Sequence, residues 1–522
     1  MNEQLGSERF DAAVIGLGAA GCWAAKVLCE RGMRVLGIDA GRLLTEADLP
    51  RELAPAPLWR RVLSPRHWIQ SRSISFHPRL AHLYVDDHRN PYATHGGEPF
   101  LWIRGRQVGG RMHTWARMAL RLAAADFTRA RADGHGIVWP IDGTALAPHY
   151  ATVERFLALR GERDGLPQLP DGELVTTSPL AAPARLFRDR VLARYPQRPV
   201  IAPRVLTGRI APMPAPLDAA LATGRLTIAT ESPVARLTLD DRAERATGVE
   251  LVDARSGARS AVRADRVFLC ASAIESVRIL LNSACARRPA GLGNAHDLLG
   301  RYVLDHNLVV ASGPTPAEYR ALMPEGPRAS TPLDLGADID FYLPDFTPTL
   351  GPRDYVRGFG VQGRIHPTQW GMGVFGEMLP DPENRVTLTE RRDAFGIRTA
   401  NIRVRRGEND LRMIAAQKAE LRTLAAAAGL PIRLPIPGIV RPLVWKAVGP
   451  EVGVMHLGVA IHETGGARMG DDPRVSVVDP QNRLWEAPNV YVTDGACFPN
   501  TGSQNPTLTI MALTVRAATL AD

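Results

Sequence analysis

The stretch Phe10–Gly21 reads FDAAVIGLGAAG and joins a short β-favouring run to a glycine-rich turn. The next segment, WAAKVLCERG at 23–32, has helical spacing and closes on a glycine that suits the position after a helix. A second apolar run, RVLGID, then ends at Asp39, about twenty residues after the glycines. The order strand, glycine turn, helix, strand and acid predicts a dinucleotide-binding βαβ unit.

Each position in this unit has a physical role. Gly16 permits the tight turn, Gly18 lets backbone N–H groups approach a pyrophosphate, and Gly21 lets the helix pack closely on the strand. The N-terminal end of the helix offers free N–H donors and a positive dipole end to the phosphates. Asp39 can accept hydrogen bonds from the adenosine ribose. The unit alone does not distinguish NAD from FAD.

The length of 522 residues exceeds the usual size of a single core and predicts two domains or more. A hydrophobic content of 45% with 22% charged residues is typical of a globular protein. No apolar run is long enough to predict a membrane-spanning helix. The first residues are polar and acidic and lack the pattern of a signal peptide, which favours a cytoplasmic protein; export together with a partner's signal is the alternative.

The net charge of +9 rests almost wholly on arginine, because the 63 basic residues include only the lysines at 26, 418 and 446, and 63 − 3 = 60. The arginines are interleaved with acids and form no basic block, which argues against a nucleic-acid partner. The five cysteines are an odd number and form no CxxC pair, so neither a disulfide framework nor a zinc site is expected. No metal site is predicted.

A second glycine pair lies in RGRQVGGRMHTW, residues 104–115. Adjacent glycines indicate a loop that passes close to something flat or phosphorylated. Arg104 and Arg106 could bind phosphate oxygens. A surface turn is the alternative interpretation of this stretch.

Four stretches together resemble the glucose–methanol–choline (GMC) oxidoreductases, a family of FAD-dependent alcohol oxidases and dehydrogenases. Besides the first glycine turn with its acid and the loop RGRQVGG, they are RVFLCASAIESVRILLNS at 266–283 and NVYVTDGACFPNTGSQNPTLTIMALTVRAA at 489–518. They extend from one end of the chain to the other, so the resemblance is more specific than any single motif.

The resemblance implies an α/β FAD-binding, Rossmann-like domain and an α+β substrate domain with a mainly antiparallel sheet. The FAD domain is expected to be discontinuous, with residues 1–45, 96–125, 196–305 and 451–522. The substrate domain then takes residues 46–95, 126–195 and 306–450. By the family's pattern, the residues expected to contact FAD are Gly16, Gly18, Ala19, Ala20, Gly21, Asp39, Ala40, Arg106, Gly109, Gly110, His113, Thr114, Val234, Ala271, Asp494, Gly495, Asn505, Pro506 and Thr507.

Periodicity predicts several elements of the substrate domain. Residues 145–160 and 408–429 have helical spacing, and the second of these segments ends at a glycine. The segment 383–406, ENRVTLTERRDAFGIRTANIRVRR, predicts a hairpin. Residues 163–217 are rich in proline and are expected to be irregular.

His462 stands before two glycines in IHETGG, residues 461–466. Alone, it could be a core histidine, a metal ligand or a general base, although HETGG lacks the HExxH spacing of a zinc site. In the GMC family a histidine at this position faces the flavin N5, and an Asn or His lies beside it, here Asn505 in SQNPTLT. The resemblance therefore implies that His462 takes the hydroxyl proton, help that is typically worth about 10²–10⁴-fold in rate, while Asn505 orients the same oxygen.

The carboxy-terminal stretch also predicts a helix at the site. Asn505 can cap this helix and Pro506 suits its first position. In the family the helix start points at the flavin pyrimidine edge, where its positive dipole end would favour the reduced flavin. His306, in LDHN, is expected to be structural or to lie near the cofactor, and His456 to lie behind the active site or in the core.

Covalent attachment of the flavin is not expected. Pyranose oxidases, a sugar-oxidising branch of the family, link FAD to the histidine of a Thr-His-Trp stretch after the glycine pair. This sequence has His113-Thr114-Trp115, so that Thr114 stands where the linked histidine would be. We therefore predict non-covalent FAD, with attachment through His113 by another path as the alternative.

The stretches FGEMLPDPENRVTL (375–388) and HETGGARMG resemble the branch that includes pyranose and C-glycoside oxidases. The resemblance implies oxidation of a secondary hydroxyl of a sugar, glycoside or polyol to a ketone, with O₂ or another redox carrier as acceptor. The alternatives are a membrane-associated sugar or sugar-acid dehydrogenase subunit that passes electrons to a cytochrome or quinone, an NAD-dependent dehydrogenase, and an inactive flavin-binding protein. Gln362, Arg364 and Trp370 are plausible pocket residues, although core positions fit them equally well.

Overall fold

The computed structural model describes residues 8–50, 64–73, 75–95, 99–206, 210–324, 339–433 and 452–522. Its largest sheet has a parallel centre. Strand β1 (Arg9–Ile15) lies between β10 (Arg259–Leu269) and β2 (Val35–Ile38), and the parallel run continues outward to β19 (Ala487–Val492) and β7 (Leu226–Ala229). Antiparallel strands β18 (Arg483–Leu484), β9 (Ala246–Val252) and β8 (Val234–Leu239) complete it.

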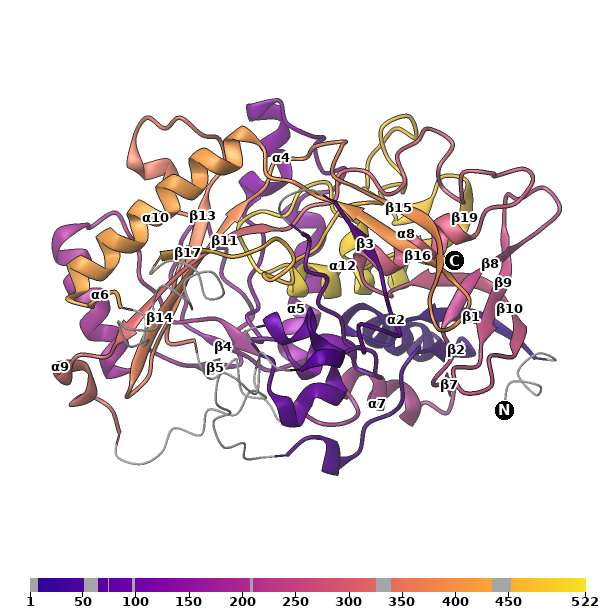
Figure 1. Ribbon diagram of the computed structural model, residues 1–522, viewed down its shortest axis with the longest axis horizontal. Helices are drawn as coiled ribbons and strands as arrows, with labels where there is room; N and C mark the ends of the chain where they lie inside the picture. Colours follow the sequence, from indigo (N-terminus) through magenta and orange to yellow (C-terminus); the bar gives the residue numbers. More distant parts are fainter. Residues whose placement is uncertain are drawn as a thin grey trace.

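Helices cover the parallel strands (Figure 1). Helix α2 (Ala19–Glu30) packs against α12 (Thr507–Leu520) and α7 (Ala215–Ala222), and α12 also contacts α5 (Gly143–Phe156). The close approach of α2 to the sheet depends on Gly21, because a Cβ at this position would lie 1.8 Å from the carbonyl oxygen of Gly16. The first glycine turn and the last helix of the chain therefore belong to one layer.

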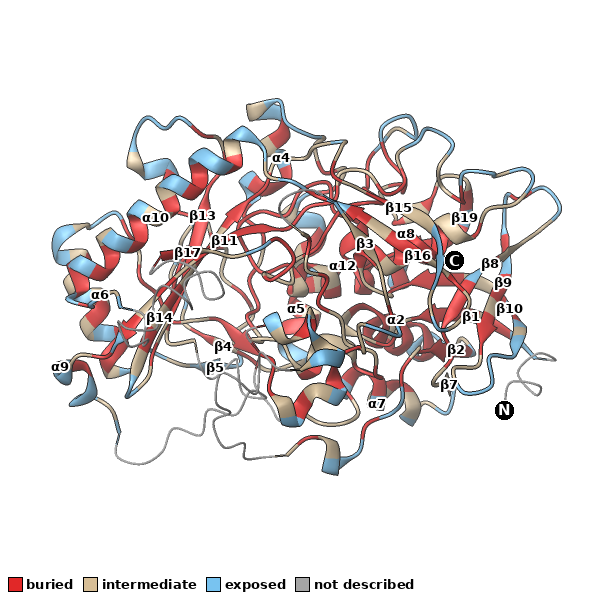
Figure 2. Cartoon of the chain, in the orientation of Figure 1, coloured by how far each residue is buried: buried red, intermediate tan, exposed pale blue. Residues whose placement is uncertain are grey.

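The second sheet is antiparallel and has the order β12 (Phe341–Leu343), β13 (Phe359–Ile365), β14 (Gln369–Glu377), β11 (His306–Pro314) and β17 (Val452–Val454). Helices α10 (Glu408–Ala428) and α6 (Ala182–Arg194) cover one face, and Figure 2 shows the buried side of α10 turned toward the strands. Because side chains alternate along a strand, Trp370, Met372 and Val374 pack under these helices while Gly371 and Gly373 face the other way. This second face borders the cavity described below.

Smaller elements complete the described fold. Two three-stranded sheets are formed by β15 (Arg385–Arg392), β16 (Arg398–Arg403) and β3 (Ala93–Thr94), and by β5 (Thr176–Thr177), β4 (Leu159–Gly161) and β6 (Val205–Leu206). The remaining α-helices are α4 (Ala124–Asp133), α8 (Ala273–Asn282) and α9 (Ala317–Arg320). The described helices include none that combines the length and hydropathy needed to cross a membrane.

The predicted fold class is confirmed, since a mostly parallel sheet with helices accompanies an antiparallel sheet. The hairpin at 383–406 is β15–β16, and the helix at 408–429 is α10, which ends at Gly429 in the left-handed conformation with φ of 70°. The expectation of an irregular segment at 163–217 was wrong, because α6 lies within it. The apolar face of α6 is narrow, and Phe187 stacks on Phe341 of the second sheet with ring centroids 4.0 Å apart.

The domain boundaries remain a prediction, with one difference at the level of strands. Strand β17 pairs with β11 in the antiparallel sheet, although the expected FAD domain resumed at residue 451. That boundary itself, and residues 434–451 in general, lie outside the described residues, as do residues 96–98 at the start of another expected FAD segment.

Candidate active site

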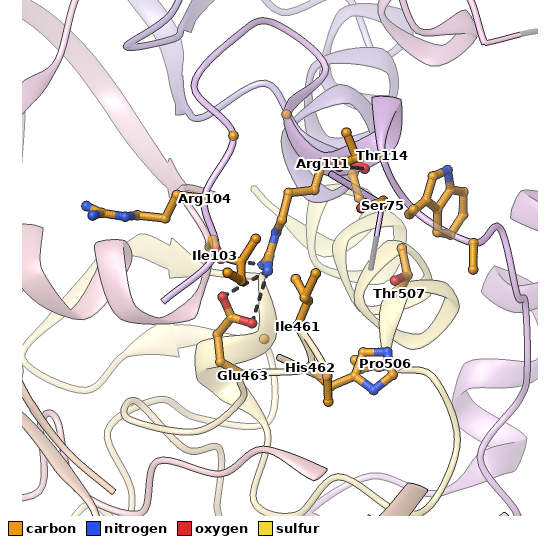
Figure 3. Close-up of a pocket in the computed structure, with 18 of the residues that line it drawn as sticks. Ser75, Ile103, Arg104, Arg111, Thr114, Ile461, His462, Glu463, Pro506 and Thr507 are labelled. Atoms are coloured by element: carbon orange, nitrogen blue, oxygen red, sulfur yellow. Dashed lines mark hydrogen bonds and ion pairs between the residues drawn. The ribbon is translucent and has the colours of Figure 1, made fainter. Parts of the chain in front are cut away.

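A cavity of about 690 Å³ lies between the parallel sheet and the open face of the antiparallel sheet. One part is lined by the two glycine loops, the start of α8 and the ribose-side acid Asp39. The other part is lined by β11, β13 and β14, and His462 with Asn505 lines the region where the parts meet. Figure 3 shows His462 next to Pro506, just before the first residue of α12, Thr507.

The two glycine loops form a narrow cradle. Gly16 has φ of +87°, and a Cβ there would lie 2.6 Å from the carbonyl oxygen of Cys270. A Cβ on Gly110 would lie 3.3 Å from the Cα of Gly18, so the two loops approach each other backbone to backbone. Side chains at these positions would fill the space in which backbone N–H groups can approach a phosphate.

Asp39 ends β2 as predicted and stabilises the first loop. Its carboxylate accepts hydrogen bonds from the Leu17 N–H at 3.0 Å and the Gly41 N–H at 2.8 Å. Burial raises the pKa of Asp39, and these two hydrogen bonds and the charge of Arg106 oppose that rise. Each carboxylate oxygen keeps a second lone pair, so Asp39 can also accept from a ribose hydroxyl.

Three arginines surround this part of the cavity. The Arg104 guanidinium lies over the ring of Trp102 at 4.0 Å and donates to the Asn90 carbonyl at 2.6 Å. Arg106 donates to the Asn90 side chain. Arg111 reaches across the cavity to Glu463, at 2.9 and 3.0 Å, and to Ser272 Oγ at 2.8 Å (Figure 3). Positive charge is thus present where a pyrophosphate would bind.

His462 belongs to a chain of hydrogen bonds in which every donor can be assigned. His306 Nε2 lies 2.8 Å from the Gly502 carbonyl oxygen, which only accepts, so Nε2 carries the hydrogen. In a neutral ring, His306 Nδ1 then accepts from His462 Nδ1–H at 2.8 Å. His462 therefore presents its lone pair at Nε2, and Asn505 Nδ2–H donates to this atom at 3.0 Å.

The chain continues beyond Asn505 and fixes its orientation. Gln362 Nε2–H donates to Asn505 Oδ1 at 2.6 Å, which leaves the Asn505 NH₂ group directed at His462. This arrangement corrects the expectation that Asn505 caps α12. The helix begins at Thr507, Pro506 occupies the capping position, and no side-chain cap bond forms because the Asn505 amide is engaged by His462 and Gln362.

His462 is neutral in this environment. Burial lowers its pKa well below the ordinary value, and the neighbouring His306 and the charge of Arg111 lower it further. Burial likewise lowers the pKa of His306. A neutral imidazole with a free lone pair can accept a proton, whereas a protonated one cannot.

The backbone around His462 is held by Asp305. The carboxylate accepts from the Gly458 N–H at 2.5 Å and from the His462 N–H at 3.3 Å. Burial raises the pKa of Asp305 to about 6, against the effect of the Gly458 hydrogen bond. Ile461, immediately before the histidine, has φ of 61°, so the loop is held in a conformation that a β-branched residue rarely adopts.

Most of the predicted site residues border one cavity. The residues that line it are Gly16, Gly18, Ala19, Ala20, Asp39, Ala40, Arg106, Gly110, Thr114, Val234, Ala271, Asp494, Gly495, Asn505, Pro506, Thr507 and His462. Three predicted residues are not among the lining residues: Gly21 lies behind the turn, Gly109 packs on the His113 ring, and His113 is buried with Nε2 3.2 Å from the Ala211 carbonyl oxygen.

Sequence reasoning missed the partners of His462. His306 was expected in a structural or cofactor-side role, and the structure places its ring directly against His462. Gln362 was considered for the pocket but not for the contact with Asn505, and Asp305 and the Arg111–Glu463 pair were not considered. His456 was expected near the site or in the core; it is exposed and does not line the cavity. Among the described residues, no group of His, Cys, Asp and Glu is arranged to hold a metal ion.

A dinucleotide cradle that opens onto a neutral histidine beside an asparagine is the site of an FAD-dependent oxidoreductase that acts on CH–OH donors, and the comparisons agree with this class. Two family models described as GMC oxidoreductase match residues 212–308 and 380–514. The chain belongs to the GMC oxidoreductase family.

Individual relatives are more distant. The chain is 28% identical to a 2-methyl-1,2-propanediol dehydrogenase of Mycolicibacterium austroafricanum, over 98% of this chain and 95% of the relative. It is 27% identical to a paromamine 6'-oxidase of Streptomyces fradiae, over 98% and 90%. A C-glycoside 3-oxidase of Arthrobacter globiformis is 30% identical over 55% of this chain and 51% of its own length. The solved structure of a formate oxidase variant from Aspergillus oryzae matches with a TM-score of 0.67 at 16% identity, covering 98% and 97% of the two chains, and shows the fold alone.

Proposed function

We propose that this enzyme oxidises a secondary hydroxyl of a sugar, glycoside or related polyol to a ketone, with His462 as the base. The observation that carries the proposal is the assigned hydrogen-bond chain, which leaves the lone pair of a neutral imidazole at Nε2 on the cavity side of the ring. A hydroxyl placed at this nitrogen can give up its proton as hydride leaves the adjacent carbon.

The other residues of the chain orient the substrate and the base. Asn505 Nδ2 carries two hydrogens, so it can donate to the substrate oxygen as well as to His462. Gln362 prevents the Asn505 amide from rotating, and His306 prevents the His462 ring from presenting the wrong nitrogen. Preset orientation of this kind lowers the entropic part of the barrier.

FAD, when bound, supplies the hydride acceptor. The residues that would hold it are the two glycine loops at the phosphates, Asp39 at the ribose, and the start of α12 at the flavin, as the cavity lining supports. We propose that it is bound non-covalently. Thr114 rather than a histidine lines the cavity after the glycine pair, and the His113 ring contacts the carbonyl oxygens of Gly110 and Ala211.

The substrate class rests on the cavity and on the relatives. On the side of the antiparallel sheet, the cavity has polar side chains that can bind hydroxyl groups, among them Gln362 and Gln369. The names of the paromamine 6'-oxidase and the C-glycoside 3-oxidase also point to glycosides. The electron acceptor is O₂ or another redox carrier, and a membrane-bound cytochrome or quinone partner is the alternative that the experiment below addresses.

The test is anaerobic reduction of the bound flavin. The purified yellow enzyme is mixed without oxygen with sugars, glycosides, polyols and simple primary alcohols, and the flavin absorbance is followed. We expect bleaching by a glycoside or polyol and a ketone product, identified by mass spectrometry and NMR. Bleaching by simple primary alcohols alone would show that the proposed substrate class is wrong.

Two further measurements use the same samples. Air admitted to the bleached enzyme restores the colour rapidly if O₂ is the acceptor, whereas slow recovery with rapid oxidation by a quinone indicates a dehydrogenase. Acid precipitation separates the protein from its flavin if attachment is non-covalent, and a yellow pellet would contradict that part of the proposal.

A further inference from the structure

The cavity-facing side of the antiparallel sheet is open and carries few side chains. The register places Gln362 opposite Gly373 and Arg364 opposite Gly371, and on the other side of β14 it places Ser312 opposite Gly371. Residues two apart on a strand point to the same face, so Gln362 and Arg364 face the cavity together. The two glycines leave open space between β13 and β11.

This surface extends away from His462. The Phe375 ring lies 5.4 Å from the His462 ring and marks the near end. Gly371, on the same strand and the same face, lies four residues further, which corresponds to roughly 13 Å along a strand. A group bound beside Gly371 would therefore be well separated from a hydroxyl held at His462, further than one pyranose ring extends.

The far end of this surface carries polar side chains that have no partner within the described part of the chain. Arg364, Ser312 and Gln369 line the cavity there, and their side chains make no hydrogen bond or ion pair with any described residue. The Arg364 side chain lies over β14, since its Nε is 3.6 Å from the position of a Cβ on Gly371. The guanidinium is thus directed over the open surface.

Acidic side chains near the cavity are already engaged. Of the carboxylates that line it, Glu463 pairs with Arg111 at 2.9 Å and Glu275 with Arg278 at 2.8 Å. Asp494 accepts from Ser276 Oγ at 2.5 Å, and Asp39 from two backbone N–H groups.

Asp340 precedes the strand next to β13, and its carboxylate accepts from the Ile365 N–H at 2.6 Å. No ion pair joins this carboxylate to Arg364 among the described residues. Arg364 is therefore a cavity cation without a described counter-ion.

We infer that the substrate carries an anionic oxygen group, a carboxylate or a phosphate ester, on the side remote from the oxidised hydroxyl, and that Arg364 binds it. The planar guanidinium can donate two parallel hydrogen bonds to such a group, and Ser312 and Gln369 can add further donors. This inference rests on the proposed function and narrows its substrate class to acidic glycosides or polyols.

The test compares aryl glucosides that differ only in charge. The probes are the 4-carboxyphenyl, 4-carbamoylphenyl, 4-phosphonooxyphenyl and 4-aminomethylphenyl β-D-glucopyranosides, used with the FAD-loaded enzyme. The second-order rate constant of anaerobic flavin reduction is measured for each, and the dissociation constant is measured separately from the change in flavin absorbance. We expect the carboxylate probe to exceed its carboxamide isostere about tenfold to a hundredfold, as for charge-assisted hydrogen bonds.

Two variants assign the effect. In Arg364→Gln the preference for the anionic probe should fall to near unity while the carboxamide probe reacts as before. In Arg391→Gln, an exposed arginine of β15 that does not line the cavity, the preference should persist. The preference should also fall as salt is added. A phosphate probe that exceeds the carboxylate probe identifies a phosphate ester as the group, and the reverse order identifies a carboxylate.

The outcomes separate this inference from the proposed function. Equal rates and equal dissociation constants for the carboxylate and carboxamide probes, or a preference that survives Arg364→Gln, would overturn the inference and leave glycoside oxidation intact. Tight binding of the anionic probe that depends on Arg364, without flavin reduction by any glycoside, would support the anion site and reject the sugar substrate class.

Discussion

His306 and His462 face each other through their Nδ1 atoms, 2.8 Å apart, with ring planes 84° apart. The two residues lie 156 positions apart in the chain, on β11 and in the IHETGG loop. Because His306 gives its only ring hydrogen to the Gly502 carbonyl, it can only accept from His462 when neutral. The pairing therefore selects the tautomer of His462 that has its lone pair at Nε2.

The first prediction concerns this pairing. In His306→Leu the Nδ1–H of His462 loses its acceptor, and the ring can rotate or change tautomer. An unsatisfied buried donor costs about 1–3 kcal/mol, so we expect flavin reduction at saturating substrate to slow about tenfold to a hundredfold, with a small change in substrate affinity. Stopped-flow reduction separates these two quantities. His306→Gln, which can still accept a hydrogen bond, should recover part of the rate; equal losses in both variants would argue against the tautomer role.

The second prediction concerns the base itself. His462→Ala should lower the rate of flavin reduction by about 10²–10⁴-fold, the usual contribution of a positioned base. The variant should remain yellow, since the cradle for FAD lies in other residues. His456→Ala is the matched control, because His456 lies nearby in sequence but is exposed and does not line the cavity. A His462→Ala enzyme with near-normal reduction would require another base.

The sequence predicts the cofactor side of this site better than the substrate side, for a physical reason. The first glycine turn and Asp39 act through local backbone geometry, so their order along the chain determines their arrangement, and Asp39 is found bonded to the turn at Leu17. The contact between His306 and His462 depends on how β11 pairs with its neighbours, and no local pattern specifies that register. The Asp-His pair at 305–306 is the only signal that could have suggested it.

Two local expectations failed because tertiary contacts outweighed local preference. Asn505 before Pro506 is a good helix-capping sequence, yet its amide is engaged by His462 and Gln362. Helix α6 was missed because its buried face has only a few apolar residues, among them Phe187 and Val191, within an arginine-rich segment. In both cases the partner that decides the conformation lies more than forty residues away.

The third prediction concerns pH. His462 accepts a proton only when neutral, and it becomes protonated as the pH falls through its own pKa, which burial, His306 and Arg111 hold well below 6.5. The rate of flavin reduction should therefore stay constant as the pH falls to 6.5 and decline only at lower pH. In Arg111→Gln the positive charge is lost and Glu463 loses its ion pair, so the acid limb should move to higher pH.

The control for the pH profile is Asp305→Asn. The pKa of Asp305 is raised to about 6 by burial, so this carboxyl titrates close to the range of interest. An acid limb near pH 6 that disappears in Asp305→Asn would belong to this carboxyl rather than to His462. A limb that stays in place in both Arg111→Gln and Asp305→Asn would contradict the electrostatic account of the base.

The last prediction tests the glycine cradle with two matched glycines. Gly18 and Gly407 are the residues before α2 and α10, with φ of −83° and −84°, and a Cβ at either meets no described atom closer than 3.6 Å. Alanine at either site should therefore leave the unfolding free energy of the FAD-free protein within about 1 kcal/mol of its original value. Only Gly18→Ala adds a methyl group facing Gly110, in the space where the cofactor phosphates would approach the backbone. We expect it to weaken FAD binding at least tenfold in a fluorescence titration, while Gly407→Ala binds FAD normally; equal affinities in the two variants would place the phosphates elsewhere.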